Sequence, residues 1–208
     1  MPKYDSIIFD LDGTLWDAAE ASATGWNAAF ERLGMSGYQV SANDIRSISG
    51  RPFVLGLEAV LAGKPITPEI LLAVDAEERR SVEAQGGTPY IGVMAGAELL
   101  AAHYRLFLIS NCQRWYLESF WNHTGLRRYF ADYDCNGLSS LLKPEMIDRM
   151  IREHGLARTI YVGDTEWDEE ASASSRIDFG YAAYGFGRAH NPTATFPSFQ
   201  ELVDWFSR

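Results

Sequence analysis

The chain has 208 residues, of which 47% are hydrophobic, 22% charged and 13% aromatic, and its formal net charge is −10. This composition excludes disordered, collagen-like and disulfide-stabilised classes, and the length suits one core domain, with or without a small inserted domain. No apolar run approaches the roughly 20 residues of a membrane span, and the acidic balance gives no basic surface for nucleic acid. The amino terminus lacks the pattern of a secretory signal. We therefore expect a cytoplasmic protein that binds neither membrane nor nucleic acid.

The first expected element is a strand. Residues 4–10 form a β-branched and aromatic run that ends in Asp-Leu-Asp-Gly, a pattern typical of a buried strand followed by a tight turn. After it, no convincing strand occurs up to residue 85, and four helical patterns cover residues 18–33, 41–49, 52–61 and 67–85. Ser41 and Thr67 are suitable N-caps for two of these helices. We predict a helical domain over residues 16–87.

Strand and helix patterns alternate in the rest of the chain. The strand-like runs cover residues 104–109, 129–135, 159–162 and 178–184, and the helical patterns cover residues 96–103, 113–124 and 144–154. Pro144 stands in the first turn of the last helix, where proline is tolerated, and Gly155 follows as a stop signal. Such alternation predicts an α/β protein with a parallel sheet and helices on both faces. The core then consists of residues 1–15 and 88–208.

Polar residues stand where three of these strands end and just before the helix at 144–154. They are Asp10, Asp12, Ser110, Asn111, Lys143, Asp164 and Asp168. Ligands of open parallel sheets bind outside the carboxyl ends of the strands. The order of the elements therefore predicts that these side chains form one site.

The carboxylates of this set suit phosphate chemistry. A carboxylate is ionised at neutral pH, so Asp10 can attack phosphorus directly and form an acyl phosphate. Convergent carboxylates suit a hard cation such as Mg²⁺, for which Asp10 and Asp164 are the natural ligands. A second carboxyl close to the first has a raised pKa, which would let Asp12 protonate the leaving oxygen and later activate water.

The remaining residues of the set suit the binding of an anion. Ser110 and the backbone amides around it, Asn111 included, can hydrogen-bond phosphate oxygens, and Lys143 supplies a positive charge. Gly13 and Thr14 allow the tight turn that brings backbone N–H groups toward an anion. The sequence thus predicts a phosphate site beside the expected metal site.

Four segments occur in the order and spacing of known motifs: Asp10-Leu-Asp-Gly-Thr-Leu15, Ile109-Ser-Asn111, Lys143-Pro144 and Gly163-Asp-Thr-Glu-Trp-Asp168. They resemble the four motifs of the haloacid dehalogenase superfamily, and the inserted helices resemble its small α-helical cap. The resemblance implies a Rossmann-like core and Mg²⁺-dependent phosphotransfer through an aspartyl phosphate on Asp10. It also implies metal binding by Asp10, the backbone carbonyl of Asp12 and Asp164, with Asp168 binding the ion directly or supporting its ligands.

Two positions in the helical segment raise further questions. Arg51 lies in a loop between two expected helices and resembles the substrate-facing cap loop of phosphoglycolate phosphatase-like relatives, where an arginine can bind a carboxylate or phosphate. A plain surface position for Arg51 is equally compatible with the sequence. Trp16 stands at the hinge, and we expect it to pack the cap against the core rather than narrow the entrance.

The resemblance favours a phosphatase that acts on a small phosphorylated metabolite of phosphoglycolate or sugar-phosphate type, as a monomer or homodimer. A β-phosphoglucomutase-like mutase is the alternative, although this chain has Ala21 and Ser22 where those relatives carry a cap histidine. A phosphonatase would need a cap lysine, for which Lys64 is the only candidate, and a dehalogenase would not be expected to have Asp12. A catalytically silent binding module is a further alternative, yet every motif residue is present.

Overall fold

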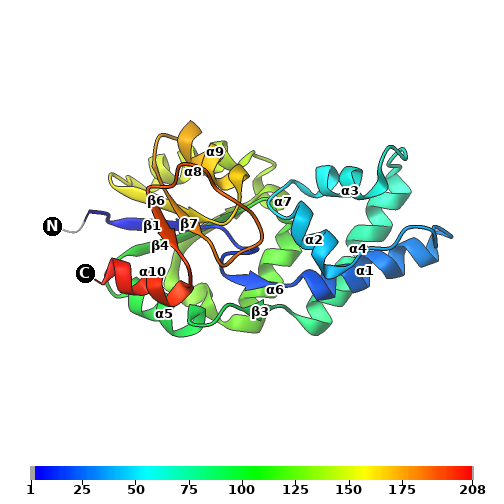
Figure 1. The fold of residues 1–208 in the computed structure, drawn as a ribbon, viewed down its shortest axis with the longest axis horizontal. Coiled ribbons are helices and arrows are strands. Elements are labelled where there is room, and N and C mark those ends of the chain that lie inside the picture. Colours follow the sequence, from blue (N-terminus) through cyan, green and yellow to red (C-terminus); the bar gives the residue numbers. More distant parts are fainter. Residues whose placement is uncertain (1–2, 208) are drawn as a thin grey trace.

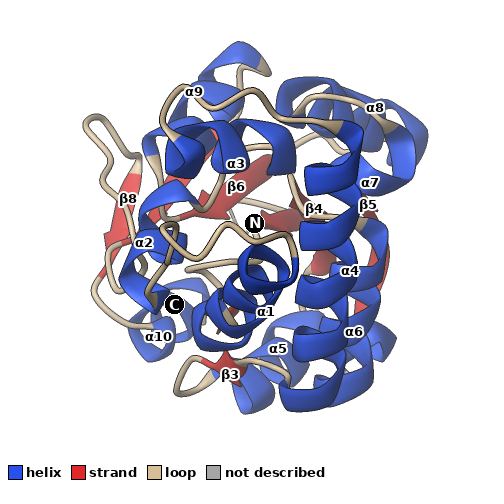
Figure 2. Cartoon of the chain, turned by 90° about the vertical axis from the view of Figure 1, so that its right-hand side faces the viewer, coloured by secondary structure: helices blue, strands red, loops and turns tan. Residues whose placement is uncertain are grey.

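The computed structural model describes residues 3–207. Within them, a six-stranded sheet flanked by helices lies at one end of the molecule and a group of four helices at the other (Figure 1). Seen from the end that carries these four helices, they stand in front of the strands (Figure 2). The carboxyl ends of the strands therefore face the helical part of the chain.

The sheet is parallel throughout, as the alternating pattern predicted. Its strands, in spatial order, are β5 (Phe130–Cys135), β4 (Arg105–Ser110), β1 (Ser6–Phe9), β6 (Thr159–Gly163), β7 (Asp178–Ala182) and β8 (Ala194–Phe196). Phe9 of β1 pairs with Leu108 of β4 on one side and Val162 of β6 on the other. β1 is thus the central strand, and chain segments that follow β1, β4 and β6 meet at one edge.

Helices cover both faces of the sheet because alternate side chains of each strand point to opposite faces. Ile7 and Phe9 pack into one core cluster with α5 (Val93–Ala101), α6 (Arg114–Thr124) and α10 (Phe199–Phe206). Ile8 packs into a second cluster on the other face, with α8 (Lys143–His154) and α9 (Glu166–Ser174). The predicted α/β class is confirmed.

Some elements differ from the sequence prediction. The helix expected at 96–103 begins at Val93, directly after a turn at Gly92 with φ +94°, and ends at Ala101. The sequence patterns did not predict α9, α10 or β8 (Ala194–Phe196), nor the short helices α7 (Asn136–Ser139) and η1 (Leu126–Tyr129). Each of them is short, and short helices depend largely on tertiary packing for their stability.

The helical part of the chain has a hydrophobic core of its own. Its helices are α1 (Ala19–Arg32), α2 (Ala42–Ile48), α3 (Phe53–Leu61) and α4 (Pro68–Gln85). Trp26, Phe30 and Leu57 are buried together in this core. The predicted caps are present, since the hydroxyls of Ser41 and Thr67 accept hydrogen bonds from backbone N–H groups of α2 and α4.

The two parts of the chain are joined by a feature that the sequence analysis missed. Trp16–Asp17 forms a two-residue strand, β2, that pairs antiparallel with β3 (Thr88–Pro89), although no strand was expected between residues 16 and 85. The pair forms because the outgoing and returning connections run side by side. Trp16 is fully buried against the rings of Tyr116 and Phe120, so the expectation that it packs the junction is confirmed. The boundaries of the inserted domain stay a prediction.

No helix within residues 3–207 is both long enough and apolar enough to cross a bilayer.

Candidate active site

The candidate site lies where β1, β4 and β6 end. Asp10 follows β1, Ser110 is the last residue of β4, and Asp164 follows β6. All three residues are at most 3% exposed. Adjacent parallel strands bring these residues together, as their positions in the sequence predicted.

Lys143 links two of the buried carboxylates. Its Nζ donates hydrogen bonds to Asp10 Oδ1 at 2.8 Å and to Asp168 Oδ1 at 2.6 Å. Burial disfavours the charged ammonium, but the attraction of Asp10 and Asp168 outweighs it and holds the pKa of Lys143 well above its ordinary value. Burial raises the pKa of Asp10 to about 7, an effect that Lys143 opposes and Asp168 reinforces. Lys143 is therefore a fixed positive charge beside the expected nucleophile.

Asp168 is fully engaged by protein groups. Besides the bond from Lys143 to Oδ1, its Oδ2 accepts hydrogen bonds from the backbone N–H groups of Asp164 and Thr165 and from the Thr165 hydroxyl. The bond from the Thr165 backbone N–H belongs to a capping box that begins α9. Of the two roles that the motif resemblance leaves open for Asp168, this geometry favours holding Lys143 and the Asp164 loop over direct metal binding.

Asp10, Asp164 and Asp168 each place a carboxylate oxygen within 4.8 Å of the others. Three buried carboxylates against the single ammonium of Lys143 leave an excess of two negative charges, which matches a divalent cation. One Asp164 oxygen, Oδ2, accepts a hydrogen bond from Phe186 N, whereas Oδ1 is buried without a partner among the described residues. A buried acceptor without a partner is costly, so the donor set fits a hard cation bound by Asp10 and Asp164.

Two glycines shape the space around Asp164. An added Cβ would lie 2.2 Å from Asp164 Oδ2 at Gly13 and 2.3 Å from Asp164 Cβ at Gly185. Gly13 also has a φ of +79°, which side chains other than glycine rarely adopt. Backbone therefore approaches the Asp164 carboxylate closely from two segments, and this close approach is the structural reason for glycine after Asp12.

Asp12 lies in a different environment from Asp10. Its Oδ1 accepts a hydrogen bond of 2.6 Å from the hydroxyl of Tyr116, on α6. Burial raises the pKa of Asp12 to about 8; the Tyr116 bond opposes this rise, and the charge of Asp10 adds to it. The raised pKa agrees with the sequence prediction, although burial contributes more to it than the neighbouring carboxylate. Asp12 is thus suited to carry a proton near neutral pH.

Of the other residues expected to bind phosphate, some line the cleft and others are buried beside it. Ser110 and Asn111 line the cleft above Asp10, but the Asn111 amide donates to the carbonyl of Gly50 in the helical part at 2.8 Å. Thr14 is fully buried, and its hydroxyl has no hydrogen-bond partner within residues 3–207. Asn111 therefore contacts the helical part directly, in addition to lying at the predicted phosphate site.

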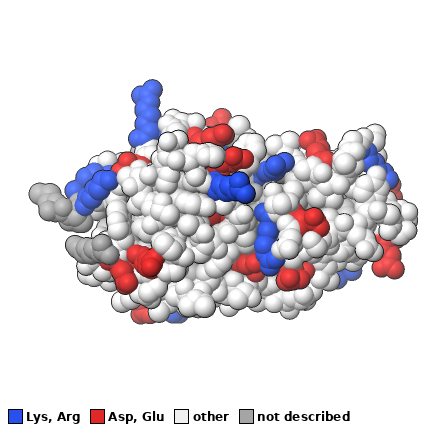
Figure 3. Space-filling view, in the orientation of Figure 1, with Lys and Arg blue, Asp and Glu red and all other residues white. Residues whose placement is uncertain are grey.

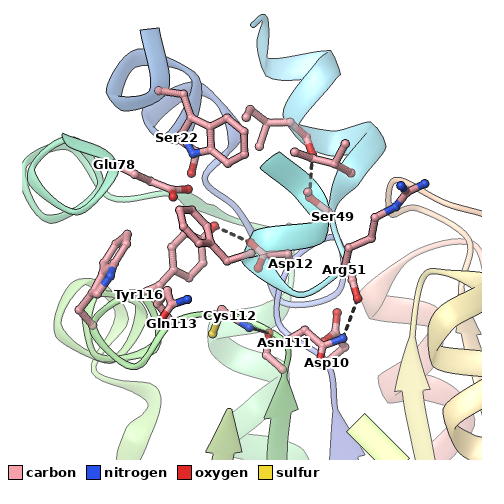
Figure 4. A pocket seen from close by; sticks show the side chains of 18 residues that line it. Asp10, Asp12, Ser22, Ser49, Arg51, Glu78, Asn111, Cys112, Gln113 and Tyr116 are labelled. Carbon is pink, nitrogen blue, oxygen red and sulfur yellow. Dashed lines mark hydrogen bonds between the residues drawn. The ribbon is translucent and has the colours of Figure 1, made fainter. Parts of the chain in front are cut away.

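The cleft above Asp10 and Asp12 is roofed by the helical part of the chain, with an empty volume of about 640 Å³ that includes its open mouth. The roof includes Ser22 and Trp26 of α1 and Glu78 of α4. Figure 4 shows Ser22 and Glu78 on the side of the cleft opposite Arg51. Substrate in this cleft would be enclosed by both parts of the chain.

Arg51 lines the mouth of the cleft, but its guanidinium points away from Asp10 and Asp12 (Figure 4). It lies 5.9 Å from the centre of the Trp167 ring. Together with Arg46 and Arg188 it borders a second, outer cleft between the two parts of the chain, where Figure 3 shows basic side chains gathered. In this conformation Arg51 does not reach the space above Asp12.

Lys64, the cap lysine that a phosphonatase would need, lies over the Tyr38 ring and does not line either cleft.

Sequence reasoning missed Tyr116 and Glu78. Tyr116 belongs to a helix in which it is flanked by core residues, and Glu78 lies in the run Asp75-Ala-Glu-Glu-Arg-Arg80 of α4, which reads as a solvated helix face. Neither residue stands at a strand end or in a motif. Only the packing of α4 and α6 over the sheet edge brings them to the site.

Comparisons with known proteins agree with this geometry. Residues 7–182 match the family model described as haloacid dehalogenase-like hydrolase. The chain is 27% identical to a phosphoglycolate phosphatase of Psychrobacter arcticus, with 96% of this chain and 94% of that protein covered, and 25% identical to one of Photobacterium profundum, with 95% and 93% covered. A solved structure from Haemophilus somnus, described as a predicted phosphoglycolate phosphatase, superimposes with a TM-score of 0.85 at 20% identity over 99% of both chains. A haloacid dehalogenase-like hydrolase from Streptococcus pneumoniae gives a TM-score of 0.82 at 22% identity, with 98% of this chain and 99% of that chain covered.

Proposed function

Because the chain belongs to the haloacid dehalogenase-like hydrolase family, we propose that it is a Mg²⁺-dependent phosphatase that hydrolyses a small phosphate monoester. The curated relatives are phosphoglycolate phosphatases, which makes phosphoglycolate or a sugar phosphate the class of substrate to examine. The observation that carries the proposal is the pair of differently placed carboxyls, Asp10 beside Lys143 and Asp12 beside Tyr116.

In the first half of the reaction, Asp10 attacks the phosphorus atom and forms an aspartyl phosphate. Lys143 keeps Asp10 oriented and offsets negative charge on the transferring group. Asp12, which carries a proton because of its raised pKa, gives it to the leaving alkoxide oxygen. In the second half Asp12 takes a proton from water as the water attacks the phosphorus, and Asp10 is released.

Asp10 and Asp164, with the backbone carbonyl of Asp12, would hold Mg²⁺. When bound, the ion offsets negative charge on the phosphate and on Asp10. Asp168 keeps Lys143 and the Asp164 loop in place through the bonds described above. Ser110 and the backbone around it are the proposed hydrogen-bond donors to the phosphate oxygens.

Release of phosphate from p-nitrophenyl phosphate tests the proposal. We expect hydrolysis with Mg²⁺ and none after chelation of the metal. The Asp10→Asn variant should lose activity by about a thousandfold or more, since it lacks the nucleophile. Asp5→Asn, a change at the opposite end of β1, is the control and should leave the rate unchanged.

Two results would count against this proposal. Unchanged activity in Asp10→Asn would show that Asp10 is not the nucleophile. A wild-type protein that released phosphate from no ester in a panel of phosphorylated metabolites would not be a phosphatase, and the catalytically silent module would then be the better reading.

A further inference from the structure

The roof of the cleft has a polar wall that the proposed mechanism does not use. It consists of Ser22 and Trp26 on α1 and Glu78 on α4, which are 1%, 3% and 8% exposed. Figure 4 shows the Glu78 carboxylate pointing into the cleft, toward the side of Tyr116. The charge of Glu78 acts on both Tyr116 and Asp12, so this wall faces the place where the leaving group would lie.

The wall offers hydrogen-bonding groups that the protein itself does not satisfy. The Ser22 hydroxyl and the Trp26 indole N–H are buried, and neither reaches hydrogen-bond geometry with a described residue. Glu78 has no ion pair within residues 3–207, whereas the adjacent Glu77 pairs with Arg32 and Arg80 outside the cleft. The Ser22 hydroxyl and the Trp26 N–H lie close enough to the Glu78 carboxyl group to favour its ionised form. Because buried polar groups in native proteins are normally paired, these two groups, which lack hydrogen-bond geometry and lie beside a buried carboxyl group, point to a polar ligand.

The charge of this wall limits what that ligand can be. Glu78 and Asp12 are both acidic, and the nearest cation of the cleft lining, Arg51, is turned outward to Trp167. Burial raises the pKa of Glu78 to about 7, and its neighbours Trp26 and Ser22 oppose that rise. In either protonation state Glu78 can hydrogen-bond a hydroxyl group, whereas above this pKa its ionised carboxylate repels an anion.

We propose that the Ser22–Trp26–Glu78 wall selects a phosphate ester whose leaving group is uncharged and carries hydroxyl groups, as in sugar and polyol phosphates, over one that carries a carboxylate. A hydroxyl both donates and accepts, so it satisfies the Glu78 carboxylate and the Trp26 N–H together. A carboxylate next to the phosphate ester would be buried against Glu78 without a cation. The inference rests on the proposed phosphatase function and names its substrate class.

Matched small esters test this selectivity. We suggest measuring kcat/KM for glycerol 3-phosphate, 2-phosphoglycolate and O-phosphoethanolamine, whose leaving groups are neutral, anionic and cationic. Wild type should prefer glycerol 3-phosphate over 2-phosphoglycolate by about tenfold or more, because juxtaposed like charges discriminate strongly. Glu78→Gln should lower that ratio by about tenfold, mainly through a lower KM for 2-phosphoglycolate, while glycerol 3-phosphate stays within a few-fold.

Glu77→Gln is the matched control. Glu77 is on the same helix and is also buried, but it does not line the cleft, so its substitution should leave the ratio unchanged. Ser22→Ala is the second variant and carries the test if Glu78→Gln does not fold. It should lower kcat/KM for glycerol 3-phosphate several-fold while p-nitrophenyl phosphate, which has no hydroxyl on its ring, is little affected.

The outcomes separate this inference from the proposed function. Wild-type preference for 2-phosphoglycolate, or a ratio that Glu78→Gln and Ser22→Ala do not change, would overturn the selectivity while p-nitrophenyl phosphate hydrolysis still supported a phosphatase. Preference for O-phosphoethanolamine would overturn it in favour of an ion pair with Glu78. Absence of any hydrolysis, p-nitrophenyl phosphate included, would overturn the proposed function itself.

Discussion

At the scale of single residues, burial gives the carboxyls of the site different properties. Burial is the largest cause of the raised pKa of Asp10, Asp12 and Asp164, but each has a different partner. Asp10 is held by a lysine, Asp12 by a tyrosine hydroxyl and Asp164 by a backbone N–H. Residues of one type therefore suit three tasks, namely attack, proton transfer and metal binding.

The Tyr116 hydroxyl favours the ionised form of Asp12, so Tyr116→Phe should raise the pKa of Asp12 further above 8. Protonated Asp12 is the form that donates to the leaving group, and it is lost as pH rises through that pKa. The alkaline limb of the pH–rate profile for an alkyl phosphate should therefore move to higher pH in the variant. Tyr104→Phe, which removes a hydroxyl bonded far from the site, is the control. A shift to lower pH would contradict the assignment of Asp12 as the acid.

Mg²⁺ should stabilise the folded protein because it offsets the excess negative charge around Asp164. A ligand present at a hundred times its dissociation constant adds about 2.7 kcal/mol to the free energy of unfolding. We expect thermal unfolding of wild type to shift upward with Mg²⁺ and to return after chelation. Asp164→Asn should lose most of that shift. Asp148→Asn, a control at an exposed position, should keep it. An equal Mg²⁺ shift in Asp164→Asn would place the ion elsewhere.

At the scale of elements, the close packing of α1 on α4 positions the wall of the cleft. Gly25 of α1 makes this approach possible, since an added Cβ would lie 2.4 Å from the Cα of Glu78. In the core, α8 begins at Lys143 with Pro144 in its first turn, which places the lysine at the sheet edge beside Asp10. Helix starts and helix contacts, rather than loops alone, therefore carry the site.

Gly25→Ala should force α1 and α4 apart. Overpacking of this kind costs about 1–3 kcal/mol, so the free energy of unfolding should fall by that amount in a urea titration. The variant should also lose selectivity among phosphate esters, because Glu78 would move. Gly37→Ala is the control, since a Cβ there would meet no atom within 4 Å. Equal stability of the Gly25 variant and wild type would mean that α1 and α4 can move apart without a cost in the free energy of unfolding.

At the scale of the whole molecule, two hydrophobic cores meet over the cleft. The core of α1 to α4 is separate from the clusters on the sheet, and the β2–β3 pair joins the two parts. Among the hydrogen bonds of residues 3–207, the Asn111 amide donates to Gly50 O at 2.8 Å and Trp115 Nε1 donates to Asp75 Oδ1 at 2.9 Å, and both bonds join the helical part to the core. The structure is thus a closed form in which the roof is held by few polar contacts.

Trp115→Phe should weaken this closure while keeping an aromatic ring in place. A typical hydrogen bond contributes about 0.5–1.5 kcal/mol, which corresponds to a rise in KM of roughly twofold to tenfold with little change in stability. Small-angle X-ray scattering should show a larger radius of gyration. Trp121→Phe, on the same helix, removes an indole N–H that has no partner among the described residues. This control should change neither KM nor the radius of gyration. An unchanged KM and radius in Trp115→Phe would show that this bond does not hold the roof.

Local patterns were enough to predict much of this protein. Strand composition and the caps at Ser41 and Thr67 predicted the alternating core and most helices, because these signals depend on residues close in sequence. The strand ends predicted that Asp10, Ser110 and Asp164 meet, because carboxyl ends of parallel strands share one edge. The short helices α9 and α10 were not predicted, although Thr165 and Ser198 cap them locally. The three-residue strand β8 is too short to give a clear pattern.

The sequence by itself therefore determined the fold class and the set of polar residues at the sheet edge. The tertiary structure decided how they are used: Asp168 is taken up by Lys143 and Thr165, and Arg51 turns outward. It also brought Tyr116 and Glu78 to the cleft from helices whose sequences show no sign of a site. The physical reason is distance: hydrogen bonds and charge interactions act over a few ångströms, and only packing of α4 and α6 over the sheet sets those separations.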